Sequence, residues 1–290
     1  MAASVVPSLS SPPTRDLQNL PNVAQRRILM CPPDFFGVAY IINPWMEGHY
    51  ARTDADKARA QWLGLRQIIE RHAVVSILPA HEGLPDLVFT ANAGLVKGQK
   101  VLLSRFRCPE RRQEQEIDRA WFVQNGFAPI DPPPNVFFEG AGDALYDPSR
   151  DLYWVGHGFR SDRDFAPLLE AALDARAVEL TLVDPRFYHL DTCLCPLPGG
   201  YLMYFPGAFD AASREKIESR VPPSRRIAVG EQDAVQFCCN AVSLDDLAIM
   251  NDASEALQDR LCEAGLTPVL TPLSEFLKAG GAAKCLTLDL

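Results

Sequence analysis

The chain has 290 residues, and 47% of them are hydrophobic, which is enough for a packed core in one large or two small domains. Its 28 lysine and arginine residues stand against 37 aspartate and glutamate residues, a formal net charge of -9. Nucleic-acid coats and anionic-membrane binders need a basic surface, so neither partner is expected. No stretch approaches the roughly 18 apolar residues that would span a bilayer. These features indicate a globular protein, which we expect to be cytoplasmic.

The eight cysteines predict neither a disulfide framework nor a metal site. The first 27 residues lack the basic and apolar segments of a secretory signal, and a chain of this length does not depend on disulfides. Cys193 and Cys195 form a C-x-C pair. Cys238 and Cys239 are adjacent, and no C-x-x-C pair is present to build a tetrahedral zinc site. Most of the cysteines should therefore be small buried hydrophobic residues.

The chain divides into an N-terminal arm and one catalytic domain. Residues 1–26 are rich in serine, proline and asparagine without periodicity, which predicts a disordered arm. Residues 27–290 then alternate between strand-like and helix-like segments, and no stretch in them is typical of an interdomain linker.

The first elements are predicted from hydrophobic periodicity. Residues 27–30 predict a strand, residues 54–72 a helix and residues 73–78 a second strand. The helix should bury one apolar face, formed by Ala58, Trp62, Leu65 and Ile69. Further helices are predicted over residues 109–125, 165–175, 211–219 and 253–264.

A turn of small residues followed by an apolar strand recurs five times. The turns are marked by Asn92, Asp143, Asp191, Asn240 and Cys285, at intervals of 51, 48, 49 and 45 residues. Each unit should hold a hairpin, a helix and a further strand, which favours an α/β propeller, although any α/β protein has turns at such intervals. If five units surround one axis, these polar residues converge on a central pocket.

Two of the candidate site residues could carry nucleophilic and acid–base chemistry. Cys285 follows the glycine- and alanine-rich run at residues 279–283, whose backbone N–H groups could approach a ligand closely. The cysteine is then a candidate thiolate nucleophile, or else a core residue after a plain turn. Strand alternation would put His189 and Asp191 on one face, where a histidine beside a carboxylate can act as acid and base. Most single histidines are structural.

Two further carboxylates, Asp86 and Glu139, stand among apolar or glycine residues. A carboxylate in such surroundings costs stability unless a cation pairs with it, and a cationic substrate could be that partner. An acidic pocket with a cysteine and a histidine favours attack on a cationic, electrophilic carbon, and a guanidinium fits.

These residues fall in motifs that resemble the guanidino-group-modifying enzymes of the pentein fold: arginine deiminases, dimethylarginine hydrolases, amidinotransferases and succinylarginine dihydrolases. The segment PDLVFTAN at residues 85–92 resembles the deiminase motif PNLYFTRD, and HLDT at residues 189–192 is the same in both. EGAGD at residues 139–143 resembles EGGD with one extra residue, and Cys285 stands at the place of the C-terminal nucleophile. The order and spacing agree over residues 28–290.

A narrower resemblance is to the arginine dihydrolase domain of cyanobacterial arginine–ornithine enzymes, which convert arginine to ornithine, carbon dioxide and two ammonia. Cyanobacterial members commonly carry a further C-terminal domain; this chain stops at Leu290, so a stand-alone or truncated form is expected. The segments that carry the resemblance are CPPD at 31–34, INPWMEG at 42–48, FTANAG at 89–94, FYHLDTC at 187–193 and KAGGAAKCLTL at 278–288.

The resemblance implies a five-bladed α/β propeller, the pentein fold, with pseudo-fivefold symmetry around a central pocket. It implies that Cys285 attacks the guanidinium carbon of L-arginine, and that His189 protonates departing ammonia and activates the water that resolves the adduct. Glu139 and Asp191 should orient the guanidinium and the imidazole. No metal or organic cofactor is expected, and a homo-oligomer stays open.

The resemblance also implies how the rest of the substrate is held. Arg111 and Arg160 should bind its carboxylate, because an arginine fork matches two oxygens, while a surface arginine is the alternative for each. Asp86 should take the α-ammonium group, and Phe89 should pack on the guanidinium or the alkyl stem. Two further pocket contacts are also expected: Asn43 and Ala279.

Asn92 stands where the deiminases have an aspartate that grips the guanidinium. An amide can donate and accept, so it can hold a cationic guanidinium or a neutral ureido group, which favours two hydrolyses. A carboxylate favours the cation and should release citrulline after one. The alternatives are a single-step arginine deiminase, a dimethylarginine hydrolase or an amidinotransferase. A non-catalytic amino-acid-binding module is a further alternative, and the complete set of Cys285, His189 and Glu139 argues against it.

Overall fold

The computed structural model describes residues 26–290, so the predicted arm at residues 1–26 lies outside the described residues except for its last member. Within residues 26–290, fifteen strands form five separate three-stranded sheets. Each sheet consists of an antiparallel pair of strands, one of which also pairs in parallel with a third strand. A helix connects the two parallel strands, as a parallel crossover requires.

Four of these units are continuous in the chain. In the first, β3 (Gly94–Lys97) and β4 (Lys100–Leu103) form the hairpin, and α2 (Glu114–Gln124) leads to β5 (Ala128–Ile130). The same order is repeated in β6 (Ala144–Asp147), β7 (Leu152–His157), α3 (Phe165–Leu173) and β8 (Ala177–Thr181); in β9 (Leu194–Leu197), β10 (Tyr201–Tyr204), α4 (Ala211–Arg220) and β11 (Arg226–Ala228); and in β12 (Val242–Leu244), β13 (Leu247–Met250), α6 (Glu255–Glu263) and β14 (Thr267–Leu270).

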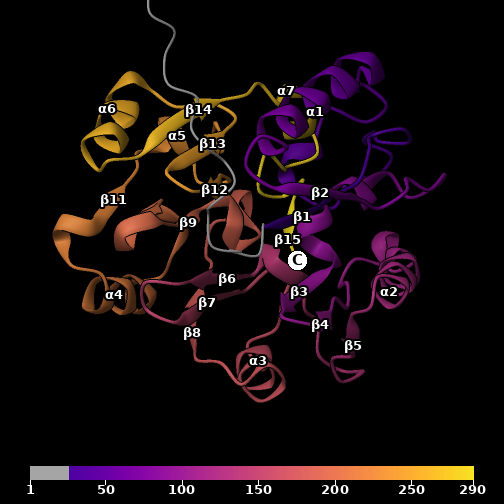
Figure 1. Ribbon diagram of the computed structural model, residues 1–290, viewed down its shortest axis with the longest axis horizontal. Coiled ribbons are helices and arrows are strands. Elements are labelled where there is room, and N and C mark those ends of the chain that lie inside the picture. The colour runs from indigo at the N-terminus through magenta and orange to yellow at the C-terminus, as the bar shows by residue number, and fades with distance from the viewer. Residues whose placement is uncertain (1–25) are drawn as a thin grey trace, which may run out of the picture.

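The fifth unit is assembled from both ends of the described chain. Strand β15 (Leu288–Asp289) pairs antiparallel with β1 (Arg27–Met30), and α1 (Ala55–Ile69) connects β1 to its parallel partner β2 (Val74–Ile77). Figure 1 shows the five units around a common centre, with α1, α2, α3, α4 and α6 at the periphery. The predicted five-bladed α/β propeller is confirmed. Two short helices lie in the connecting segments: α5 (Glu231–Ala234) and α7 (Ser274–Leu277).

Helix α1 shows how the sequence pattern becomes structure. Its buried side chains are the four of the predicted apolar face: Ala58, Trp62, Leu65 and Ile69. The Asp54 carboxylate caps the helix by accepting a hydrogen bond from the Lys57 backbone N–H. The predicted helix over residues 109–125 begins differently, because Pro109–Arg111 forms a 3-10 turn (η5) before α2 starts at Glu114.

The polar residues that mark the repeats lie in tight turns, not in strands. His189 precedes the 3-10 turn η8 (Leu190–Thr192), and β9 begins only after it. The prediction that His189 and Asp191 share a strand face is therefore wrong. The backbone N–H and the hydroxyl of Thr192 both donate to the His189 carbonyl, at 3.2 and 2.6 Å, and close the turn. Equivalent turns precede β3 and β6: η4 (Thr90–Ala93) and η6 (Gly140–Gly142).

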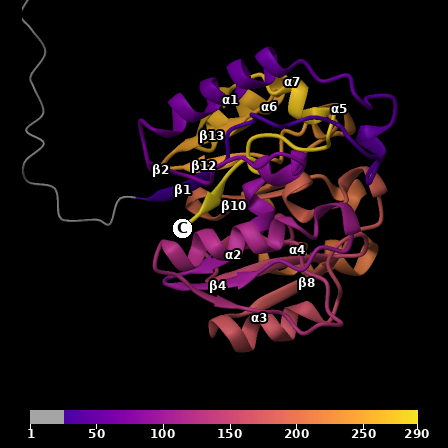
Figure 2. The same cartoon turned by 90° about the vertical axis from the view of Figure 1, so that its right-hand side faces the viewer.

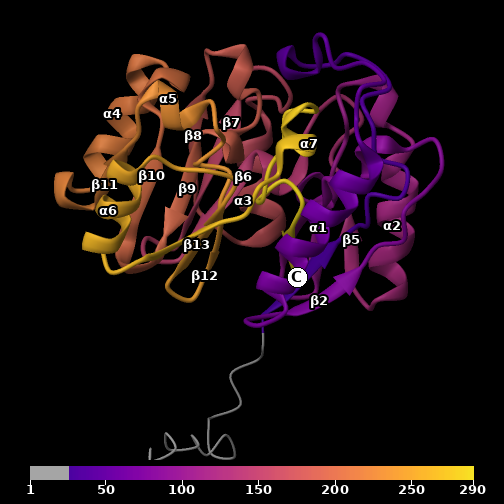
Figure 3. The ribbon, with the colours of Figure 1, turned by 90° about the horizontal axis from the view of Figure 1, so that it is seen from above.

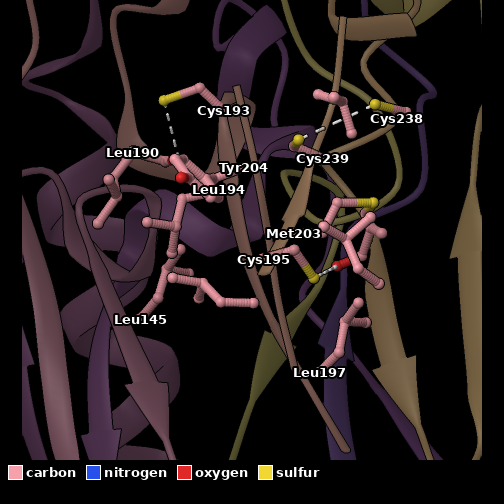
Figure 4. Close-up of a cluster of buried hydrophobic side chains, with 14 of the residues drawn as sticks. Leu145, Leu190, Cys193, Leu194, Cys195, Leu197, Met203, Tyr204, Cys238 and Cys239 are labelled. Carbon is pink, nitrogen blue, oxygen red and sulfur yellow. Dashed lines mark hydrogen bonds between the residues drawn. The ribbon is translucent and has the colours of Figure 1, made fainter. Parts of the chain in front are cut away.

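The core between two of the units is rich in sulfur. Figure 4 shows Cys193, Cys195, Cys238 and Cys239 packed among leucine side chains, with the Cys238 and Cys239 sulfur atoms 3.9 Å apart. All eight cysteines fall within the described residues, and all are free thiols, six of them buried. The prediction that most of them are small buried hydrophobic residues is confirmed.

The propeller axis has two unlike ends. The tight turns meet at one end, which we call the front. The innermost strands β3, β6, β9, β12 and β15 surround a cavity of about 500 Å³, which we call the rear cavity. The C-terminus, labelled in Figures 2 and 3, lies at this cavity together with Arg26 and Asp289. Among residues 26–290, no helix has the length and apolar character needed to traverse a membrane.

Candidate active site

A second cavity at the front, the front cavity, gathers most of the predicted site residues. Its volume is only about 10 Å³, room for about one water. The residues that line it are Ile42, Asn43, Asp86, Phe89, Asn92, Arg111, Arg160, Tyr188, Ala279, Gly281 and Cys285. Eight of these belong to the predicted site, and the remaining three predicted residues, His189, Glu139 and Asp191, are buried beside it. Sequence reasoning missed Ile42, Tyr188 and Gly281, although each is next to a predicted residue or inside the glycine-rich run.

His189 and Glu139, the predicted acid–base residues, are in contact with each other beside the cavity. The imidazole Nε2 lies 2.8 Å from Glu139 Oε2, and Arg160 Nη1 donates to the same oxygen at 3.0 Å. The other Glu139 oxygen accepts from the Arg107 backbone N–H at 3.1 Å. Burial disfavours the charged carboxylate, but the Arg160 guanidinium and His189 outweigh it and hold the Glu139 pKa well below its usual range. A permanent carboxylate therefore orients the imidazole, as a histidine general acid and base requires.

Cys285 faces a second buried carboxylate. Its Sγ lies 3.2 Å from Asp191 Oδ2, so the thiol donates a hydrogen bond to Asp191. Burial, and then the charge of Asp191, raise the pKa of the Cys285 thiol well above its usual value. Burial likewise raises the pKa of Asp191, to about 7. Among the described residues, no group hydrogen-bonds to Asp191 Oδ1. The pair holds a protonated thiol, and Lys284 offsets the charge of Asp191 only in part.

Asn92 and Arg111 are bound to each other at the front cavity. Arg111 Nη1 donates to Asn92 Oδ1 at 2.9 Å, and Asn92 Nδ2 donates to the Glu139 carbonyl at 2.9 Å. Arg111 also donates to both Glu114 oxygens, at 2.9 and 2.7 Å, and to the Asp86 carbonyl at 3.1 Å. The Arg111 guanidinium therefore binds Glu114 through two hydrogen bonds, and one of its Nη1 hydrogens has no acceptor within residues 26–290. Binding of the substrate carboxylate by Arg111 stays a prediction.

Arg160 and Asp86 each have hydrogen-bonding groups without a partner among the described residues. Arg160 donates to Glu139 and to the Ile42 carbonyl, and its guanidinium lies 4.6 Å from the centre of the Tyr188 ring. Three of its five N–H groups have no acceptor among the described residues. Asp86 is 2% exposed, and its Oδ1 has no hydrogen-bond partner in the same part of the chain. Burial raises the pKa of Asp86, so this carboxylate also lacks a sufficient counter-charge.

The glycine-rich run permits close packing behind the cavity. A Cβ at Gly281 would lie 2.5 Å from the Phe89 ring and 3.1 Å from the Cys285 Cβ. Gly280 has a φ of +84°, and a Cβ there would lie 2.8 Å from the Tyr188 hydroxyl. The sequence predicts that the backbone of this run approaches a ligand closely. In the structure, the closest neighbours of Gly280 and Gly281 are side chains that line the cavity.

The front cavity is covered by the segment that precedes α1. Asn43 Nδ2 donates to the Ala279 carbonyl at 3.0 Å, and Trp45 Nε1 donates to the Arg186 carbonyl at 2.6 Å. At this volume the cavity does not hold a molecule the size of an amino acid, so binding one requires neighbouring groups to move. Within residues 26–290, no three His, Cys, Asp or Glu side chains are grouped as they would be to hold a metal ion.

Comparison with known sequences identifies relatives. A sequence model of the family described as "N,N dimethylarginine dimethylhydrolase, eukaryotic" matches residues 46–290. The bifunctional arginine dihydrolase/ornithine cyclodeaminase ArgZ of Synechocystis is 54% identical over 262 residues, which are 90% of this chain. The match spans only 37% of the length of ArgZ. The N(G),N(G)-dimethylarginine dimethylaminohydrolase of Mycobacterium tuberculosis is 41% identical over 267 residues, 91% of this chain and 86% of that protein.

The fold is also that of a solved structure. The crystal structure of the N-terminal domain of ArgZ bound to substrate matches with a TM-score of 0.90 and 53% identity, and covers 91% of this chain and 97% of that one. The same domain has been solved covalently bound to a reaction intermediate, and the match has the same values. The similarity therefore extends over the fold as a whole and is not confined to the motifs.

Proposed function

Since the chain belongs to the N,N-dimethylarginine dimethylhydrolase family, whose fold is the pentein fold, we propose that it hydrolyses the guanidinium of L-arginine in two cycles. The products are L-ornithine, carbon dioxide and two ammonia. One observation carries the proposal: two buried carboxylate oxygens, Asp86 Oδ1 at the front cavity and Asp191 Oδ1 beside it, lack partners in residues 26–290. The thiol of Cys285, which lines the cavity, donates to the other oxygen of Asp191. L-arginine carries two cationic groups that match them, an α-ammonium and a guanidinium.

The substrate supplies the charge that the nucleophile lacks. A guanidinium beside Asp191 compensates that carboxylate and stabilises a negative charge on the adjacent sulfur, which lowers the thiol pKa. The Cys285 thiol gives its proton to His189, the thiolate attacks the guanidinium carbon, and His189 passes a proton to the nitrogen that departs as ammonia. His189 then removes a proton from water, which attacks the covalent adduct and releases Cys285. The 2.8 Å contact with Glu139 keeps the imidazole in place for both steps.

The second cycle acts on the ureido group formed in the first. The thiolate attacks its carbon, the second ammonia leaves, and water cleaves the thioester-like adduct to a carbamate, which loses carbon dioxide to give ornithine. Asn92 supports this sequence because its remaining Nδ2 hydrogen can donate to a neutral ureido oxygen, where a carboxylate would repel it. The 54% identity with a protein named as an arginine dihydrolase supports the same reaction.

The remaining groups account for the amino-acid end of the substrate. The three available N–H groups of Arg160 suit the α-carboxylate, and the last N–H of Arg111 can add to them. Asp86 takes the α-ammonium, and the Phe89 ring packs against the alkyl stem. Asn43, from the segment before α1, and Ala279, from the glycine-rich run, close the site through their mutual hydrogen bond.

Product analysis tests the proposal against a second candidate. The 41% identity with a dimethylarginine dimethylaminohydrolase favours hydrolysis of dimethylarginine as that second candidate. The protein is incubated separately with L-arginine and with N,N-dimethylarginine, and ammonia, dimethylamine, citrulline and ornithine are quantified. We expect two ammonia for each ornithine and little citrulline. One ammonia for each citrulline would make the protein a deiminase, and faster release of dimethylamine would select the second candidate.

A further inference from the structure

Asn240 is fully buried and makes four hydrogen bonds, the complete capacity of an amide. Its Oδ1 accepts from the backbone N–H groups of Ala282 and Cys285, at 3.0 and 3.1 Å. Its Nδ2 donates to the Asp191 carbonyl at 3.0 Å and to the Cys285 sulfur at 3.1 Å. One side chain therefore fixes both the backbone and the reactive atom of the nucleophile.

Other residues that mark the repeats show which of these hydrogen bonds are common to the repeat and which are particular to Asn240. Asn92 donates to the Glu139 carbonyl, and Asp143 accepts from the Leu190 backbone N–H at 3.0 Å. Each thus bonds the backbone of the next unit, as Asn240 does, and this bond joins neighbouring units of the propeller. The contact between Asn240 and the sulfur is an addition to it. Asn240 is not among the residues that line the front cavity, although Cys285 is.

We propose that Asn240 positions Cys285 and stabilises its thiolate through the Nδ2–H donor, as part of the machinery for the proposed hydrolysis. A hydrogen bond to a charged acceptor is stronger than one to a neutral acceptor, so the Nδ2–H favours the thiolate over the thiol. The role follows from geometry, because the sulfur lies between one donor, Asn240, and one acceptor, Asp191. When the thiol proton leaves, the bond from Asn240 remains and strengthens, whereas the bond to Asp191 is lost.

The groups that face the sulfur act in different directions. Asp191 faces it from turn η8 and opposes ionisation, and the buried Tyr188 lies close enough to interact with its charge. Lys284, the neighbour of Cys285 in the chain, partly offsets the charge of Asp191. The Ala282 backbone and the Asn240 side chain are neutral groups that lower the pKa of the thiol, and Asn240 is the one of the two that a substitution can alter directly.

The test is the pH dependence of alkylation at Cys285, followed by mass spectrometry of its peptide after brief exposure to iodoacetamide. The variant is Asn240→Asp, which keeps an acceptor for the two backbone N–H groups and replaces the donor with a second oxygen. The matched control is Asn251→Asp. Asn251 is also a buried amide that joins two backbone groups, the Gln236 carbonyl at 3.0 Å and the Leu273 N–H at 2.8 Å, and it does not contact the sulfur. The exposed Cys262 gives the intrinsic alkylation rate in every sample.

In Asn240→Asp we expect the alkylation midpoint of Cys285 to rise by about one to two pH units, and its rate at neutral pH to fall roughly 10- to 100-fold. Asn251→Asp should leave both unchanged. An unchanged midpoint in a folded Asn240→Asp protein, or an equal shift in both variants, would overturn the proposal. Because alkylation needs no substrate, this result is independent of whether the protein hydrolyses arginine.

A second measurement uses the unaltered sequence, so it does not depend on the folding of a variant. In protein labelled with ¹⁵N, the side-chain amide protons of Asn240 should shift with pH at the midpoint found by alkylation. The same signals should lose this titration in Cys285→Ser. Amide signals that do not respond to ionisation of Cys285 would contradict a thiolate held by Nδ2–H.

Discussion

The front and the rear of the propeller axis are built from the same five units but differ in packing and charge. At the front, the tight turns bring buried carboxylates, arginines, a histidine and a cysteine around a cavity of about 10 Å³. At the rear, the innermost strands leave a cavity of about 500 Å³ lined largely by aliphatic side chains. Two of the charged groups there, Arg26 and Lys284, pair with Asp289, which is half exposed.

Unfavourable electrostatic interactions are concentrated at the front of the axis. The rear pairs cost little, because solvent screens them. The front carboxylates Asp86 and Asp191 are buried and incompletely compensated, and burial raises the pKa of both. Such groups destabilise the empty protein and become favourable when a cation arrives, which is typical of a binding site and not of a structural core. The following predictions test this asymmetry between the ends.

The largest effect should come from Cys285→Ser. A hydroxyl is a far weaker nucleophile than a thiolate, so turnover of arginine should fall at least about 10³-fold while the fold is retained. Activity is measured as ornithine and citrulline formed, and the thermal midpoint serves as the folding control. In the wild type, a mass increase on the peptide containing Cys285 should report the trapped adduct. Near wild-type turnover in Cys285→Ser would rule out covalent catalysis at this position.

The next effect should come from His189→Ala. Departure of ammonia and attack by water both need a proton carrier, and general acid–base catalysis typically contributes about 10² to 10⁴-fold. The variant also removes the partner that Glu139 holds at 2.8 Å, so circular dichroism and the thermal midpoint are needed alongside the rate. A loss below about tenfold in a folded protein would return His189 to a structural role.

The fold could be predicted from the sequence because its signals are local and repeated. The apolar face of α1 and the five turns at intervals of 45 to 51 residues specify helices and units without knowledge of long-range contacts. The closure of the fifth unit is different, since the pairing of β15 with β1 joins residues at opposite ends of the chain. That pairing has no local signal and follows only from completing the repeat.

The members of the site could be predicted, but their hydrogen-bond partners could not. Residue type and motif indicate Arg111 and Asn92 as binding groups. They carry no information that the Arg111 fork grips Glu114, because that pairing depends on how η5 and α2 are packed. The role inferred for Asn240 is similar: its place in the repeat marks it, and only the 3.1 Å contact with the sulfur sets it apart. Strand alternation failed at His189 because a tight turn replaced the expected strand.

A smaller and more selective effect is expected from Asn92→Asp. One carboxylate oxygen can keep the bond from Arg111 Nη1, while the other replaces the amide donor at the front cavity. The added charge should favour the cationic guanidinium over the neutral ureido group by about 1–3 kcal/mol, the scale of hydrogen bonds to charged groups. The first hydrolysis should then continue and citrulline should accumulate with one ammonia. The measurement is the ratio of citrulline to ornithine at low conversion, and an unchanged ratio in an active variant would show that Asn92 does not select the outcome.

The smallest effect is expected at the rear, from Ser243→Leu. Ser243 lies on β12 and lines the rear cavity, and its backbone carbonyl, which accepts from Arg26 Nη1 at 2.7 Å, is kept in the variant. Because this cavity is lined by none of the proposed catalytic residues and has room for added methyl groups, kcat/KM should stay within about twofold and the free energy of unfolding within about 0.5 kcal/mol. Gly281→Ala is the matched change at the front, where a single added methyl would lie 2.5 Å from the Phe89 ring. Overpacking of this kind costs about 1–3 kcal/mol and displaces groups next to the nucleophile. If Ser243→Leu impaired turnover as much as Gly281→Ala, the two ends would be coupled and the division of the axis into a catalytic front and an inert rear would be wrong.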